Sequence, residues 1–91
     1  MPIRIRYLGL VYRASGLYEE IIYLDTPIPI SALLEIVFER HPEVMKLIYV
    51  EGGLNPLYRI LLNGRDIEHL EGLNTKVYDG DVVTFSSPFG G

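Results

Sequence analysis

The fold is decided by the stretch Ile30-Ser31-Ala32-Leu33-Leu34-Glu35-Ile36-Val37-Phe38. Its apolar side chains recur at positions i, i+3, i+4, i+7 and i+8, which is the spacing of one face of an amphipathic helix. We expect Ser31 to be the N-cap and the helix to run to about His41, because Pro42 disfavours helical geometry for the residue before it. Such a helix needs a sheet on which to bury its apolar face.

A hairpin is predicted before this helix. Residues 3–13 are predicted to form a strand, because Ile3, Ile5 and Tyr7 alternate with Arg4, Arg6 and Leu8. Residues 17–24 are rich in β-branched and aromatic residues. Ala14-Ser15-Gly16 has turn composition, so the two strands are expected to pair. Two prolines between residues 25 and 29 cannot sit inside a strand ladder, so we expect that stretch to be irregular.

Shorter elements are predicted after the helix. Pro42 is well suited to begin a second short helix through Ile48, and residues 51–56 have loop composition. A third strand is expected over residues 57–62, ended by an Asn63-Gly64 turn. The remaining elements are short irregular structure over 67–73, a tight turn at 79–81 and a last strand over 82–85.

The order of these elements predicts an α+β fold, with a mixed four- to five-stranded sheet and one main helix packed on one face. If the first and last strands lie side by side, they are parallel, which is the arrangement of a β-grasp (ubiquitin-like) domain. We expect one domain over residues 1–86 and a flexible tail over residues 87–91 that ends in Gly-Gly.

The composition excludes several kinds of function. The 91 residues contain no cysteine, so disulfides, thiolate nucleophiles and thiolate metal sites cannot form. The net charge of −4 argues against nucleic acid as a partner, and no apolar run approaches the roughly 20 residues that span a bilayer. We therefore expect no nucleic-acid partner, no membrane partner and a cytoplasmic location.

The ionisable side chains form no recognisable catalytic or metal site. His41 and His69 have no carboxylate at metal-ligand spacing, so both are interpreted as ordinary surface or helix-end histidines. Asp79 and Asp81 flank Gly80 and are best explained as turn residues. We expect this chain to bind no metal and no cofactor.

The sequence ends in Ser86-Ser87-Pro88-Phe89-Gly90-Gly91. A glycine pair loses much backbone entropy on ordering, so it has little reason to pack on the domain. It does offer a thin strand without side chains and with a carboxylate at its tip, which can enter a channel too narrow for a Cβ atom. The alternative is a frayed end whose last residues happen to be glycine.

Several motifs together resemble one family. They are Ile60-Leu61-Leu62-Asn63-Gly64-Arg65-Asp66-Ile67, Leu70-Glu71-Gly72-Leu73-Asn74-Thr75, Asp79-Gly80-Asp81-Val82-Val83 and the ending Pro88-Phe89-Gly90-Gly91. In this order and spacing they resemble the molybdopterin synthase small subunit (MoaD-like) family of ubiquitin-like sulfur carrier proteins. Members usually carry two prolines before the final glycines, whereas this sequence has Ser87-Pro88-Phe89 and one residue fewer.

The resemblance implies a mechanism for the C-terminus. A ubiquitin-activating-like adenylating enzyme would use ATP to adenylate the carboxylate of Gly91, and sulfur transfer would give a thiocarboxylate. The tail, led by Gly90, would then enter the molybdopterin synthase large subunit. There it would donate sulfur in the biosynthesis of the molybdenum (or tungsten) cofactor, and the chain itself would be a non-catalytic carrier subunit.

Other functions use the same ending. A ubiquitin-like protein modifier would be conjugated to lysines through Gly91, and sulfur carriers for tRNA or thiamine thiolation share the Gly-Gly ending. A β-grasp binding module with an inert tail belongs to a third class. The sequence does not separate these functions, because all of them are compatible with the same body.

Candidate partner-binding residues lie on one predicted face of the sheet. Strand alternation places Arg4, Arg6 and Leu8 on the side opposite the apolar face of the first strand. The same alternation places Arg59 and Leu61 on that side of the third strand. We expect this mixed face of arginine and leucine to dock acidic surfaces of partners, with a merely solvated face as the alternative.

The last aromatic residues are expected to differ in role. Phe85 alternates in phase with Val83 and is predicted to lie in the core. Phe89 follows Pro88 beyond the last strand, where a large side chain has no obvious core to enter. We expect Phe89 to contact a partner, with Pro88 and Ser87 beside it, because exposed aromatic residues are favoured anchors at interfaces.

Overall fold

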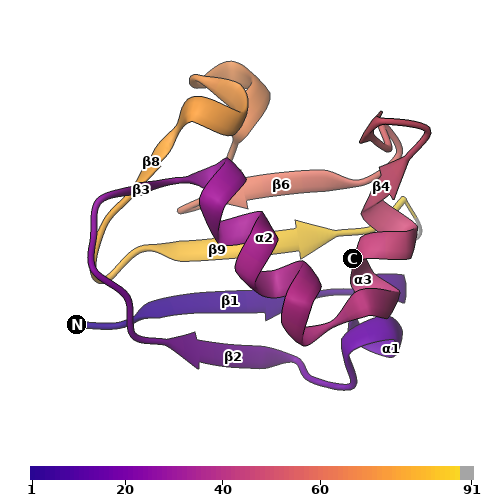
Figure 1. The fold of residues 1–91 in the computed structure, drawn as a ribbon, viewed down its shortest axis with the longest axis horizontal. Coiled ribbons are helices and arrows are strands. Elements are labelled where there is room, and N and C mark those ends of the chain that lie inside the picture. The colour runs from indigo at the N-terminus through magenta and orange to yellow at the C-terminus, as the bar shows by residue number, and fades with distance from the viewer. Residues whose placement is uncertain (89–91) are drawn as a thin grey trace.

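The main helix, α2 (Ile30–Arg40), lies across one face of a five-stranded sheet (Figure 1). The computed structural model describes residues 1–88. The strands of the sheet are β1 (Ile3–Tyr7), β2 (Glu19–Ile22), β6 (Arg59–Leu62), β7 (Arg65–Asp66) and β9 (Val82–Ser86). They are hydrogen-bonded in the order β2-β1-β9-β6-β7.

The first and last strands form the centre of this sheet. β1 and β9 are parallel, with Arg4 beside Val82 and Tyr7 beside Phe85. β2 is antiparallel to β1, and β6 is antiparallel to β9. The predicted α+β, β-grasp arrangement is therefore confirmed, including the parallel pairing that joins the two ends of the fold.

The strand predicted over residues 3–13 is wrong beyond Tyr7. The chain leaves the ladder at Gly9, whose φ of 59° and ψ of −127° are readily adopted only by glycine. It then forms the helix α1 (Leu10–Ser15), which buries Val11 completely. β1 and β2 pair as predicted, but their connection contains this helix instead of a simple turn.

The helix α2 buries the predicted apolar stripe. Four of its members are buried and the fifth, Phe38, is partly buried; the four are Ile30, Leu33, Leu34 and Val37. The N-cap prediction is wrong, because Pro29 holds that position and Ser31 lies inside the first turn. A distant backbone group replaces the side-chain cap, since the Ile30 N–H donates to the Thr75 carbonyl at 2.9 Å.

The following helix, α3 (Pro42–Ile48), begins at the predicted proline. The predicted loop after it contains a short antiparallel ladder of β4 (Tyr49–Val50) and β5 (Gly53–Leu54). The proline-containing stretch also forms a ladder, between β3 (Ile28–Pro29) and β8 (Lys76–Val77). Proline is tolerated there because β3 is a two-residue edge strand.

The turn after β6 has the predicted chemistry. Asn63 and Gly64 have φ angles of 51° and 83°, and they join β6 to β7. The Asn63 side chain also accepts the Val82 N–H at 2.9 Å, which fixes this hairpin to the start of β9. Beyond it, two 3-10 turns, η1 (Ile67–His69) and η2 (Gly72–Asn74), agree with the predicted irregular stretch.

The core lies between α2 and the sheet. Phe85 is fully buried as predicted, and its ring stacks on the Tyr7 ring at a centroid distance of 5.7 Å. Ile3, Ile5 and Val83 are also fully buried, and each such side chain contributes about 1.5–3 kcal/mol through burial. Among residues 1–88, no helix has the length and apolar composition needed to cross a membrane.

Candidate functional site

The sheet face opposite α2 carries the predicted partner-binding residues. Register places Arg6 beside Thr84 and Leu61 across from the same threonine, so one row runs over β1, β9 and β6. Arg59 lies across from Ser86 in the next row. Arg4 lies beside Val82 in β1. The structure thus brings the four strand residues together on one surface, which we call the open sheet face.

Leu8 lies at the edge of the open sheet face. It follows the last residue of β1 and is half-buried. Its N–H donates to the Phe85 carbonyl at 3.0 Å, so the parallel ladder extends one residue beyond the assigned strand. The residue is thereby held beside the end of β9, from which the tail departs.

Each arginine of the open sheet face has a carboxylate partner within the chain. Glu19 of β2 contacts Arg4 at 3.5 Å and Arg6 at 3.3 Å. Both arginine side chains remain about half exposed, at 52% and 50%. Exposed pairs of this kind contribute little to stability, roughly 0–1 kcal/mol, but they cancel the local charge.

Arg59 is held more tightly. Its guanidinium contacts Asp66 at 2.7 Å and Glu68 at 2.9 Å. The hydrogen bond from Arg59 lowers the pKa of Asp66, and hydrogen bonds to Asp66 and Glu68 raise the pKa of Arg59. Three arginines thus face three carboxylates, so these six groups together carry no formal net charge. The expectation that this face docks acidic surfaces of partners stays a prediction.

Sequence reasoning missed these carboxylates because they come from other elements. Glu19, Asp66 and Glu68 belong to β2, β7 and η1. A hairpin register would have revealed one pair, since Arg6 lies directly across from Glu19. The register could not be fixed from the sequence, because α1 was predicted as strand.

The base of the tail is fixed to the domain. Ser87 is 7% exposed, and its Oγ accepts the Leu10 N–H at 3.3 Å. Its side chain therefore faces α1, so this structure gives no support to its predicted role as a partner contact. Pro88 is exposed, whereas Phe89, Gly90 and Gly91 lie outside the described residues. The predicted roles of Pro88 and of these three stay predictions.

A cluster of polar side chains around Glu20 joins the edge strand β2 to β1 and to the end of α2. The sequence did not reveal this cluster. Glu20 accepts the Tyr7 hydroxyl at 2.7 Å, contacts His41 Nε2 at 2.9 Å and accepts from Arg40 at 2.9 Å. His41 lies at a helix end, as one of the two predicted alternatives has it, because it follows α2 and precedes α3. Its side chain is only 14% exposed, so it is not a surface histidine. Glu19 and Glu20 point to opposite faces of β2, and only Glu19 lies on the open sheet face.

The cluster shifts the acidity of two members. Burial raises the pKa of Glu20, but hydrogen bonds from Tyr7, His41 and Arg40 outweigh it and hold that pKa below its usual value. Burial, and then the bond to Glu20, raise the pKa of the Tyr7 phenol far above its usual value. Tyr7 therefore remains a hydrogen-bond donor, and the cluster acts as a structural clamp between β1, β2 and α2.

The remaining ionisable side chains that were singled out from the sequence are isolated surface or turn residues. Within residues 1–88, no three His, Asp or Glu side chains gather as metal ligands, and the sequence has no cysteine. His69 is exposed, and Asp81 accepts the Tyr78 N–H at 2.8 Å as a turn residue. The open sheet face and the anchored tail base can position a partner.

The fold and the sheet face define a ubiquitin-like β-grasp protein whose last strand leads into a Gly-Gly ending. The chain belongs to the ThiS family, whose model matches residues 5–91. The family resemblance predicted from the sequence motifs is thereby confirmed.

Two curated relatives are similar over part of the chain. A putative sulfur carrier protein of Archaeoglobus fulgidus is 38% identical over 42 residues, which are 46% of this chain and 48% of that protein. Small archaeal modifier protein 3 of Haloferax volcanii is 39% identical over 41 residues, 45% of each chain. The matched stretches span about half the length of these relatives.

Solved structures are similar over the whole fold. Small archaeal modifier protein 1 of Methanosarcina acetivorans has a TM-score of 0.84 at 24% identity, over 99% of this chain and 95% of that one. The Haloferax volcanii protein of the same name has a TM-score of 0.85 at 16% identity, over 100% and 99%. A putative molybdopterin converting factor, subunit 1, of Pyrococcus furiosus has a TM-score of 0.73 at 25% identity, over 97% and 98%.

Proposed function

We propose that this chain is a sulfur carrier and the small subunit of a molybdopterin synthase. The observation that carries the proposal is a ThiS-family β-grasp body whose central strand β9 is followed, after Ser87-Pro88-Phe89, by Gly-Gly. Similarity to a putative sulfur carrier protein and to a putative molybdopterin converting factor subunit supports it.

The reacting group in this proposal is the carboxylate of Gly91. A carboxylate is a poor electrophile, so an adenylating partner first joins it to the α-phosphate of ATP and releases pyrophosphate. A sulfide equivalent supplied by a partner then attacks the acyl carbon, AMP leaves, and a thiocarboxylate remains. The chain has no cysteine of its own, so its C-terminal acyl group is where the sulfur attaches.

The body contributes position. The open sheet face supplies Leu8 and Leu61 as apolar contacts, flanked by arginines whose charges are already paired. Desolvating a paired guanidinium leaves it with hydrogen-bond partners, so such a face can be covered by a partner without stranding a charge. Ser87, held on the Leu10 N–H, fixes where the tail leaves the domain.

A second candidate function rests on the similarity to small archaeal modifier protein 3. In that case a lysine amine attacks the activated Gly91 and forms an isopeptide bond. Sulfur carriers for tRNA or thiamine thiolation use the same first two steps and differ only in the acceptor. The acceptor therefore decides between these functions, and a reconstituted reaction can identify it.

The test uses the full chain carrying a chemically prepared C-terminal thiocarboxylate. Mixed with the molybdopterin synthase large subunit and the pterin precursor, it is expected to form the sulfur-containing pterin with loss of its own sulfur. A variant that lacks Gly90-Gly91 is the control and should transfer nothing. Absence of transfer from the loaded chain, with a positive-control carrier active in the same mixture, would contradict the molybdopterin role.

A further inference from the structure

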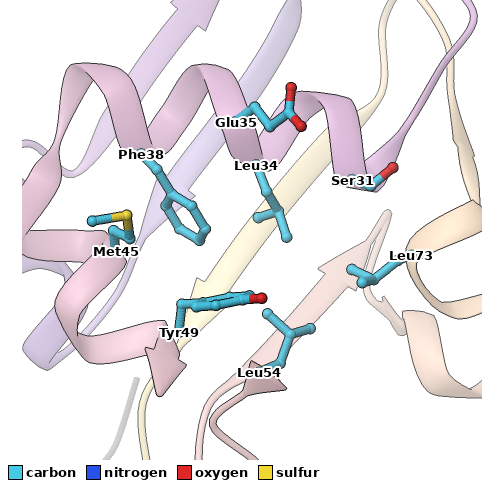
Figure 2. A pocket seen from close by; sticks show the side chains of 8 residues that line it. All are labelled: Ser31, Leu34, Glu35, Phe38, Met45, Tyr49, Leu54 and Leu73. Atoms are coloured by element: carbon cyan, nitrogen blue, oxygen red, sulfur yellow. The ribbon is translucent and has the colours of Figure 1, made fainter. Parts of the chain in front are cut away.

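A groove lies on the helix side of the domain, away from the open sheet face. It is formed where α2 meets α3, the β4–β5 hairpin and η2, and its volume is about 340 Å³. Its lining is mostly apolar and consists of Ser31, Leu34, Glu35, Phe38, Met45, Tyr49, Leu54 and Leu73. Figure 2 shows Leu34 and Phe38 pointing from the helix toward Tyr49 and Leu54 across the groove.

Several apolar side chains of this groove remain in water. Tyr49 is 48% exposed, and Met45 and Leu73 are each 39% exposed. Leu34, by contrast, is only 4% exposed and forms part of the floor. Exposed apolar side chains that converge on a hollow are typical of a surface that another protein covers.

The wall opposite α2 is held in place by two hydrogen bonds that Asn55 donates to α3. The Asn55 N–H donates to the Ile48 carbonyl at 2.6 Å, and the Asn55 side chain donates to the Leu47 carbonyl at 3.2 Å. These bonds tie the end of the β4–β5 hairpin to α3. The groove is therefore formed before a partner arrives, which reduces the ordering entropy that binding would cost.

The charge at the rim of the groove is negative. Glu35 lines it, and Figure 2 shows its carboxylate turned outward from the apolar floor. Glu39 follows one helical turn later and is also exposed. Within residues 1–88 neither carboxylate has an ion-pair partner. A cationic side chain of a partner would be attracted to this rim.

We propose that the groove is a second docking surface, which binds a protein segment with apolar side chains next to lysine or arginine. Leu34, Phe38 and Tyr49 would contact the apolar side chains, and Glu35 and Glu39 would pair with the cations. Because α2 separates the groove from the open sheet face, both surfaces can be occupied at once. This inference goes beyond the proposed sulfur-carrier function and does not depend on the acceptor.

The test titrates the full chain, labelled for NMR, with a synthetic amphipathic helical peptide. The peptide carries leucines at i, i+3 and i+4 and lysines beside them, and a matched peptide has glutamates in place of the lysines. We expect the lysine peptide to shift amide signals of α2, α3 and the β4–β5 hairpin. The glutamate peptide is expected to bind at least about fivefold more weakly, a difference of about 1 kcal/mol.

Variants locate the binding. Glu35→Lys is expected to weaken the lysine peptide about fivefold to tenfold, whereas Asp25→Lys makes the same charge change at an exposed site outside the groove. Tyr49→Ser should weaken both peptides, with Leu57→Ser as the exposed apolar control outside the groove. Amide spectra of every variant establish that the fold is kept.

Three outcomes would overturn the proposal. They are signal shifts confined to the open sheet face, equal affinity for the two peptides, and equal effects of Glu35→Lys and Asp25→Lys. Concentration-dependent self-association that is abolished by Tyr49→Ser would instead assign the groove to a second copy of the chain. A failure of the sulfur-transfer experiment leaves these measurements unaffected, so the two proposals fail separately.

Discussion

The two surfaces of this domain differ in how they treat charge. On the open sheet face, Arg4, Arg6 and Arg59 are each paired with a carboxylate of the same chain. At the helix-side groove, neither Glu35, which lines it, nor Glu39, one helical turn further along α2, has such a partner within the described residues. Both surfaces also present exposed or half-buried apolar side chains. The feature in which they differ is therefore whether their charged side chains are paired within the chain.

This difference shows that several arginines on one face do not by themselves make a surface that attracts acidic partners. The mixed face of arginine and leucine was expected to dock acidic surfaces, and the structure shows that its three arginines are paired with three carboxylates of the same chain. We therefore expect docking there to depend on shape and on redistribution of the existing hydrogen bonds. The groove keeps an uncompensated negative rim, so its partner is selected by charge.

The largest expected effect comes from breaking the core that supports both surfaces. Phe85→Ala removes a fully buried ring stacked on Tyr7, and it should destabilise the fold by about 3–5 kcal/mol. Chemical denaturation followed by circular dichroism measures this change. The control is Thr84→Ala, at the residue before Phe85, whose side chain lies on the open sheet face. It should lower the free energy of unfolding far less. Equal losses for the two variants would contradict the assigned core.

A smaller effect is expected from the clamp that joins the sheet edge to α2. Glu20→Ala leaves the buried Tyr7 hydroxyl without its acceptor, which should cost about 1–3 kcal/mol. The measurement is the free energy of unfolding at neutral pH. Glu19→Ala, which removes only exposed ion pairs, is the matched control. A cost for Glu20→Ala no larger than that of Glu19→Ala would refute the clamp.

The same clamp predicts a dependence of stability on pH. The pKa of Glu20 is lower in the folded chain than in the unfolded chain, because the bonds from Tyr7, His41 and Arg40 outweigh burial. Its contribution is therefore complete above the unfolded pKa and is lost as the pH falls through the folded pKa. Unfolding curves at a series of acidic pH values should show a shallower decline for Glu20→Gln than for the unaltered chain. Parallel declines would be inconsistent with this assignment.

Charge reversal separates the two surfaces from each other. The double variant Arg4→Glu, Arg6→Glu places new carboxylates beside Glu19, and it should weaken binding of the adenylating enzyme about tenfold, or about 1.4 kcal/mol. The affinity of the lysine peptide for the groove should not fall. Arg65→Glu, on the β7 hairpin and outside the ion-paired row, is the single-site control. Unchanged affinities for the adenylating enzyme and for the molybdopterin synthase large subunit would argue against docking through the open sheet face.

The smallest effect is expected at the exposed pair of Lys46 and Glu43. These side chains are 67% and 65% exposed and lie 3.0 Å apart on α3, outside both surfaces. Glu43→Gln should change the free energy of unfolding by no more than about 0.5 kcal/mol. It should leave binding at both surfaces unchanged. A marked loss of binding would show that the boundaries drawn for the two surfaces are wrong.

Much of the fold followed from local pattern. The apolar spacing of α2, the Asn63-Gly64 turn and the alternation of β9 each depend on neighbouring residues, and all three were predicted correctly. The helix α1 was missed because the strand predicted from the alternation of residues 3–8 was extended past Gly9, where the chain leaves the ladder. Its presence became visible only when the backbone at Gly9 and the burial of Val11 were known.

The site was less predictable than the fold. Strand alternation placed Arg4, Arg6, Arg59 and Leu61 on one face, because period two is a local property. The partners of these arginines and the burial of His41 depend on pairing between distant strands, which alternation does not specify. Ser87 was assigned to the tail for the same reason, since its contact to Leu10 joins residues far apart in sequence.

The central claim is that Gly91 becomes a thiocarboxylate. The most direct measurement is intact mass spectrometry of the full chain isolated from its native cells, with fragmentation that locates any change. The account predicts a C-terminal fragment heavier by the difference between one sulfur and one oxygen atom. That increase should be lost in cells without the adenylating enzyme. An unmodified Gly91 in every condition, or Gly-Gly remnants on lysines of other proteins without any thiocarboxylate, would contradict it.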